Sequence, residues 1–256
     1  MTLAKRLKLI FIAAATLLAA ACSDKDNDPL SLADVRGSLQ LTFPHEPYAF
    51  SVRGGDGNYT ATSGDDRILY AAISGSVLTL RSEAAGTTEL TITDGSGETL
   101  RIPVTIEAYR QRMVVEKLYA RASGEKLDPS DKATIEARAL ETIPIAAGGG
   151  FDFVYTGYSE DNNPAGIVTI YPETFGTGGT ETPFERMKIE EGKHVYTCYV
   201  FTAGGRERRY IISQYNGRST AMQEMALTED VTGLFEENYP TLENAYTQMS
   251  VSQPEH

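Results

Sequence analysis

Short segments that alternate apolar and polar residues, separated by turn motifs, fill residues 38–106. Successive side chains of a β-strand point to opposite faces, so each segment offers one apolar face to a core. Leu90 and Ile92 share one such face, and Leu100 and Ile102 share another. The candidate strands start 9–11 residues apart, at 38–43, 48–53, 58–62, 68–73, 77–81, 87–93 and 98–106. This spacing predicts a β-sandwich over residues 35–107.

The turns between these segments carry signals of their own. DGSG (94–97) joins two alternating segments, and glycine accepts the positive φ that a tight hairpin requires. In its order of turns and strands, from GGDGNYTAT (54–62) to TTELTITDGSGET (87–99), the region resembles bacterial immunoglobulin-like domains of the Big family. The resemblance implies an immunoglobulin-like spacer or adhesive module that lifts another domain away from a membrane.

Residues 112–256 show a mixed pattern. A helix is expected from Pro129 to about Thr142, because Asp128 or Ser130 can cap its first turn and Pro144 would end it. Five strand segments are expected at 151–156, 166–172, 184–190, 194–201 and 207–215. Two C-terminal helices are expected from apolar stripes, one of Val231, Leu234 and Phe235, the other of Leu242, Ala245, Tyr246 and Met249.

The chain is therefore predicted to be mainly β with an α+β second domain. An immunoglobulin-like β-sandwich would be followed by an antiparallel sheet packed with helices. The expected divisions are a lipoprotein signal peptide at 1–21, a tether at 22–34, the sandwich at 35–107 and an α+β domain of unknown function at 112–256.

The first 21 residues predict export. Lys5, Arg6 and Lys8 precede an apolar run from Leu9 to Ala20, and small residues lead into Cys22. The run is shorter than the roughly 20 apolar residues that a membrane-spanning helix needs, so it is interpreted as a cleavable secretory signal.

Cys22 predicts how the exported chain is held. LLAAAC (17–22) resembles the lipobox of bacterial lipoproteins, although Ala19 stands where leucine is usual, and SDKDND (23–28) resembles the export signal of surface lipoproteins in Bacteroidetes-type bacteria. These resemblances imply lipidation at Cys22 and an outer-membrane protein at the cell surface, with the periplasmic face as the alternative. A soluble secreted protein is the other interpretation.

Charge and cysteine content limit the partners. Without Lys5, Arg6 and Lys8 the chain keeps 20 basic and 35 acidic residues, a net charge near −15. Nucleic acids and anionic lipid headgroups need cationic surfaces, so no nucleic-acid partner is expected. If Cys22 carries lipid, Cys198 has no intramolecular partner, and the fold must be stable without a disulfide.

No motif predicts catalysis, a metal or a cofactor. His194 and Cys198 lie in one expected strand, with Cα atoms about 13 Å apart, too far for a thiol–imidazole pair. The turn acids lack the ligand spacing of a calcium loop and are expected to make local hydrogen bonds. These acids are Asp56, Asp65, Asp66 and Asp94. No enzyme is expected, although abundant carboxylates leave a paired-acid hydrolase open.

Tyrosines offer a candidate ligand platform, because flat aromatic rings often bind sugars. The competing interpretation is cross-strand packing within a sheet. The candidate residues are Tyr155, Tyr158, Tyr171, Tyr196 and Tyr199. The basic group of Arg206, Arg208 and Arg209 is interpreted as a solvated strand edge, with a ligand clamp as the alternative.

Together these patterns predict a cell-envelope lipoprotein that acts as a binding or adhesion module. Its immunoglobulin-like spacer would present a distal domain that binds a glycan or an envelope protein. The alternatives are a structural or assembly subunit of an envelope complex and a glycan-active hydrolase.

Overall fold

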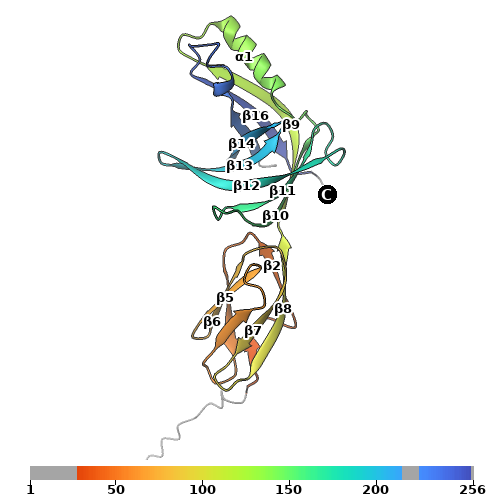
Figure 1. Cartoon of the computed structure of the whole chain (residues 1–256), viewed down its shortest axis with the longest axis vertical. Coiled ribbons are helices and arrows are strands. Elements are labelled where there is room, and N and C mark those ends of the chain that lie inside the picture. The colour runs from red at the N-terminus through yellow and green to blue at the C-terminus, as the bar shows by residue number, and fades with distance from the viewer. Residues whose placement is uncertain (1–27, 215–224, 255–256) are drawn as a thin grey trace, which may run out of the picture.

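The structure, a computed structural model, describes residues 28–214 and 225–254, so Cys22 and the predicted signal peptide lie outside the described residues. The described chain is mainly β: two four-stranded sheets are followed by a closed eight-stranded antiparallel barrel (Figure 1). It contains a single α-helix. Within these two ranges, no helix is both long enough and apolar enough to cross a membrane.

The two small sheets contain all seven strands predicted between residues 38 and 106, with bounds that differ by no more than two residues. One sheet has the order β1-β3-β6-β5 and the other β2-β8-β7-β4. Strands β2 and β8 are parallel, and the other neighbours are antiparallel. The strands are β1 (Ser31–Leu32), β2 (Leu39–Phe43), β3 (Tyr48–Arg53), β4 (Thr60–Ser63), β5 (Leu69–Ser74), β6 (Val77–Ser82), β7 (Gly86–Thr93) and β8 (Thr99–Ala108).

The sandwich core has the predicted alternation. Leu90 in β7 lies opposite Ile102 in β8, and both side chains are buried. Leu78 and Leu80 in the other sheet belong to the same core. The predicted tether is shorter than expected, because Leu32 in β1 is also buried in this core and pairs with β3.

The barrel has the order β10-β11-β12-β13-β14-β15-β16-β9, and β9 closes it by pairing with β10. The sequence did not predict β9, which pairs with β10 through its first five residues and with β16 through the rest. The barrel strands are β9 (Arg110–Ser123), β10 (Gly150–Tyr158), β11 (Pro164–Tyr171), β12 (Thr180–Glu191), β13 (His194–Ala203), β14 (Arg206–Gln214), β15 (Met225–Asp230) and β16 (Asn244–Ser252).

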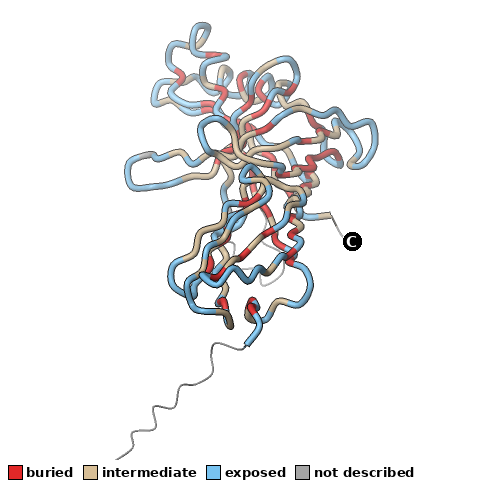
Figure 2. Tube along the Cα trace, turned by 60° about the horizontal axis from the view of Figure 1, so that its bottom comes forward, coloured by how far each residue is buried: buried red, intermediate tan, exposed pale blue. Residues whose placement is uncertain are grey.

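Aromatic side chains fill the barrel interior. Phe151, Phe153 and Tyr155 alternate along β10, and none has exposed surface. Phe153 stacks on Tyr199 of β13 with ring centroids 4.3 Å apart. Figure 2 shows buried positions recurring along the barrel strands. The interior is thus packed with side chains, as expected for a barrel of eight strands.

The predicted helix is confirmed as α1 (Pro129–Glu141). Asp128 caps it by accepting the Ser130 amide at 2.7 Å, and Pro129 occupies its first turn. Ile135 and Ala139 are buried in a second apolar cluster with residues of β9 and β16. The helix covers the part of the β9–β16 strand pair that lies farthest from the sandwich (Figure 1).

The predicted α+β second domain, an open sheet packed with helices, is wrong. The first expected C-terminal helix, with Val231, Leu234 and Phe235, is a short 3-10 turn (Thr232–Leu234) that follows β15, and the second is strand β16. In β16 the buried residues alternate, as at Thr247, Met249 and Val251. Ala245 and Met249 fit both a helical stripe and a strand face, and pairing with β9 and β15 makes this segment a strand.

A buried ion pair lies on the inner face of the barrel. Arg208 donates to Glu229 at 2.9 Å, and also to the carbonyls of Thr142 at 2.7 Å and Ala203 at 3.1 Å. The segment after α1 is thereby tied to β13 and β15. The interpretation of Arg206, Arg208 and Arg209 as a solvated strand edge is wrong for Arg208, which is buried in this ion pair, while Arg209 is exposed.

Candidate functional site

The sandwich and the barrel are joined by Tyr109, which lies between the end of β8 and the start of β9. The Tyr109 amide donates to the Phe43 carbonyl at 2.7 Å, and the Tyr109 carbonyl accepts from the Tyr155 amide at 3.0 Å. These bonds fix the path of the chain as it passes from one body to the other.

A second contact joins the two bodies away from the connecting chain. The Ala85 amide donates to the Thr156 carbonyl of β10 at 3.0 Å. Phe43 of β2 is fully buried and packs edge-on against Tyr158, with ring centroids 4.9 Å apart. Hydrogen bonds and aromatic packing therefore hold the base of the barrel against the sandwich.

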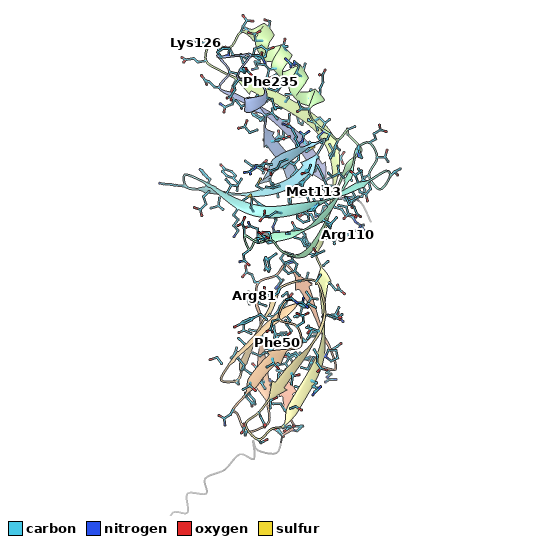
Figure 3. All side chains as sticks on the ribbon, viewed as in Figure 1. Phe50, Arg81, Arg110, Met113, Lys126 and Phe235 are labelled. Carbon is cyan, nitrogen blue, oxygen red and sulfur yellow. The ribbon has the colours of Figure 1, made fainter. Side chains whose placement is uncertain are left out.

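Two clefts adjoin this contact and share Tyr158 and Asn162. The first has a volume of about 440 Å³ and includes Tyr70 and Arg81 of the sandwich. The second has a volume of about 600 Å³ and includes Arg186 of β12. We call the two together the junction cleft. Figure 3 places Arg81 at the end of the sandwich that faces the barrel.

The sandwich contributes an aromatic face and a cation to the junction cleft. Tyr70 in β5 keeps 46% of its surface exposed. The Arg81 guanidinium lies 5.2 Å from the centroid of this ring and pairs with Glu83 at 2.5 Å. A cation held between a ring and a carboxylate has a restricted position, so this wall is preorganised.

The turn between β10 and β11 contributes an amide. Asn162 has a φ of 60°, and its backbone N–H donates to the Ser159 carbonyl at 3.0 Å. Asn163 donates through its side chain to Glu185 at 2.7 Å, and Ser159 donates to the same carboxylate. With the turn held in this way, the side chain of Asn162 forms no hydrogen bond with any described residue.

The second half of the junction cleft is rich in cations. The Arg186 guanidinium lies over the Tyr155 ring, 5.1 Å from its centroid. Lys188 and His45 line the same half, where Glu46 is the one carboxylate among the described lining residues. This half is therefore locally cationic, although the whole chain carries a net charge of −12.

Tyr158 lies between the two halves. Burial raises the pKa of its phenol, and the nearby Glu83 carboxylate raises this pKa further. The hydroxyl therefore stays neutral at physiological pH and can both donate and accept a hydrogen bond.

The structure does not gather the five predicted tyrosines on one surface. Tyr155 and Tyr199 lie inside the barrel, where their hydroxyls are 3.0 Å apart, so these two rings cannot form an exposed platform. Tyr171 packs against Phe175, and Tyr196 lies near His194 at the start of β13. Of the five, Tyr158 lines the junction cleft.

The other candidate groups have structural roles. Cys198 is fully buried, and burial raises the pKa of its thiol, which disfavours the reactive thiolate. Asp94 accepts hydrogen bonds from Ser96, Glu98 and Asp56, which confirms the local role expected for this turn acid. The described residues contain no group of three or more side chains that could hold a metal ion.

Sequence reasoning missed Tyr70, Arg81, Asn162 and Arg186. Each comes from a different element, so no local spacing could bring them together. The acidic composition was the one available signal, because an arginine without a nearby carboxylate is unusual in such a chain. Which arginine lacks a nearby carboxylate can be seen only in the folded structure.

The fold defines a mainly β protein in which two small sheets precede an eight-stranded antiparallel barrel. No family model matches the chain. No curated protein matches it either. Among solved structures, the SrpA adhesin from Streptococcus sanguinis matches with a TM-score of 0.23 and 15% identity, over 61% of this chain and 91% of that chain.

Proposed function

We propose that this protein is a glycan-binding module of a bacterial cell envelope and that the junction cleft is its binding site. The carrying observation is that Tyr70 from the sandwich and Tyr158 from the barrel line one cleft together with Asn162. Aromatic faces pack against the apolar faces of sugar rings, and amides exchange hydrogen bonds with sugar hydroxyls. A concave site with a few converging polar groups is typical of small-ligand recognition.

The proposed activity is binding without hydrolysis. A glycosidase needs two carboxyl groups that flank the scissile bond, one to protonate the leaving oxygen and one to act as nucleophile or base. At the junction cleft, Glu83 is paired with Arg81, and Glu185, which does not itself line the cleft, accepts from Ser159 and Asn163. These two carboxylates have structural partners, and the other two that line the cleft, Asp66 and Glu46, lie in different halves of it.

The proposal includes a lipid anchor at Cys22 and an immunoglobulin-like spacer between the anchor and the barrel. A Cys22→Ala variant is expected to move from the membrane fraction to the soluble fraction, and intact mass should lose the acyl chains. Membrane association that persists in this variant would contradict the anchor while leaving the binding site untouched.

Glycan binding is tested by calorimetric titration against a panel of neutral and acidic oligosaccharides. Tyr70→Ala is expected to weaken binding by about tenfold, because it removes one exposed stacking face worth about 1.4 kcal/mol. Tyr119→Ala is the matched control, because Tyr119 is 39% exposed on a barrel strand and does not line the cleft. Equal affinities for both variants would contradict the site.

A second candidate function is assembly with an envelope protein, and the exposure of the apolar side chain of Val195 favours it. This side chain is 60% exposed near the tip of the hairpin that β12 and β13 extend beyond the barrel wall (Figure 1). Loss of a co-purified envelope partner in Val195→Asp, with glycan binding intact, would support assembly.

A further inference from the structure

Arg186 is the one described arginine that is half-buried and yet has no carboxylate of another described residue within salt-bridge distance. The other shielded arginines, Arg112, Arg206 and Arg208, each reach Asp152 or Glu229. Arginines that lack a carboxylate elsewhere, such as Arg121, are exposed. Removing a guanidinium from water costs free energy unless an acceptor compensates, so this group is suited to an anion from outside the chain.

We infer that the junction cleft takes an acidic glycan and that Arg186 binds the carboxylate of the sugar. The inference rests on the proposed function and adds the chemical class of the ligand. Two hydrogen bonds from the planar guanidinium to the two carboxylate oxygens would match the donor fork to the acceptor pair.

The position of Arg186 is restricted by the barrel core. Its guanidinium lies over the ring of Tyr155, which is fully buried and whose hydroxyl lies 3.0 Å from that of Tyr199. A cation stacked on a fixed ring loses little freedom when an anion arrives, and that limits the entropic cost of binding.

The charges around Arg186 favour the binding of an anion in its half of the cleft. Lys188 and His45 line it with Arg186, and Lys188 forms no salt bridge with a described residue. Glu46 opposes them as a single carboxylate among the described lining residues. The balance is cationic at neutral pH even with His45 uncharged.

The charge of the whole molecule distinguishes this site from simple adsorption of polyanions. A net charge of −12 repels a polyanion at long range, so attraction arises only at contact distance within the cleft. The carboxylate of a fitting sugar should therefore bind better than a denser but unmatched polyanion.

The test uses the whole chain carrying Cys22→Ala, titrated with oligomers of galacturonate, alginate and hyaluronan. Each oligomer is compared with its methyl ester, which keeps the backbone and removes the charge. The acid form of at least one oligomer should bind at least about tenfold more tightly than its ester, the ratio expected for a charge-assisted hydrogen bond. Dextran sulfate should bind more weakly than this oligomer.

Three variants locate the effect. Arg186→Gln should abolish the preference for the acid over the ester while keeping the weaker binding of the ester. Arg186→Lys should lose most of the preference, because an ammonium cannot present a planar fork. Arg121→Gln is the control, because Arg121 is an exposed arginine that lies on the barrel outside the cleft and has no described carboxylate partner. This variant should bind like the parent protein.

The inference is overturned if acid and ester bind equally, if Arg186→Gln keeps the preference, or if dextran sulfate binds as tightly as the best acid. Neutral glycans that bind in a Tyr70-dependent manner, with no acidic oligomer binding, would overturn the inference and leave the proposed function standing. Failure of every glycan in both panels would overturn both.

Discussion

The amide of Ala85 donates to the carbonyl of Thr156 at 3.0 Å and so links the sandwich to the barrel beside the junction cleft. The next residue, Gly157, has room for a Cβ at 3.7 Å from the Ala84 Cβ, but a larger side chain would meet the sandwich loop.

Gly157→Leu is therefore expected to push the two bodies apart. The crowding should cost about 1–3 kcal/mol of stability and increase the spread of distances between the bodies. Small-angle X-ray scattering and thermal unfolding measure the two effects. Gly157→Ala is the control, because a methyl group fits at an ordinary contact distance, and equal behaviour of the two variants would contradict close packing here.

Tyr199→Phe is expected to destabilise the barrel by about 1–3 kcal/mol. Its hydroxyl donates to Gln111 at 2.5 Å and lies 3.0 Å from that of Tyr155, so removal leaves buried groups without partners. Tyr210→Phe is the matched variant, because the Tyr210 hydroxyl is buried without a hydrogen-bond partner among the described residues.

Chemical denaturation should show Tyr210→Phe to be neutral or stabilising, since no hydrogen bond is lost. A loss of stability in Tyr210→Phe as large as in Tyr199→Phe would contradict this explanation, because Tyr210→Phe removes no hydrogen bond.

Glu229→Leu should cost about 3–5 kcal/mol, because it leaves the buried Arg208 guanidinium without its carboxylate. The double variant Glu229→Leu/Arg208→Met should recover part of this loss, since the fully buried charge is removed and Arg206, the other partner of Glu229, is partly exposed to water. Urea unfolding of both variants checks the expectation, and a double variant no more stable than the single one would refute it.

The strand pattern of the sandwich could be predicted from the sequence because the signal is local. In β7 and β8, every second residue faces the core, as Leu90 and Ile102 do, and glycine-containing turns separate the strands. The helix α1 was also predictable, since Asp128 and Pro129 mark its start.

The C-terminal strands were not predictable in the same way. Ala245 and Met249 satisfy a helical stripe as well as a strand face, and the choice is made by pairing with β9, more than a hundred residues earlier. The candidate site was hidden for a similar reason. Tyr70 and Arg186 line parts of one cleft only because the barrel base packs on the sandwich, and the most buried predicted rings fill the core instead.

Asp94 gives the sandwich a predictable response to acid. Hydrogen bonds from the Ser96 side chain, and then from backbone amides, hold the pKa of this carboxyl below its ordinary value of 3.8. Because the folded pKa is the lower one, the carboxylate stabilises the fold above pH 3.8, and this contribution is lost as the pH falls through the folded pKa.

Asp94→Asn should therefore be less stable than the parent protein at pH 7, and the difference should shrink in acid. Thermal unfolding between pH 7 and pH 2 measures this convergence. Asp161→Asn, a change at an exposed turn position, serves as the control. A gap that stays constant down to pH 2 would show that the lowered pKa of Asp94 does not contribute to stability.

Amide hydrogen exchange with and without the best-binding acidic oligomer tests the location of the ligand most directly. Binding in the junction cleft predicts slower exchange at two segments, residues 159–163 in the β10–β11 turn and residues 186–188 in β12, and unchanged exchange along β16. Protection confined to β16 and β9, with neither cleft segment affected, would contradict the assignment of the junction cleft as the binding site.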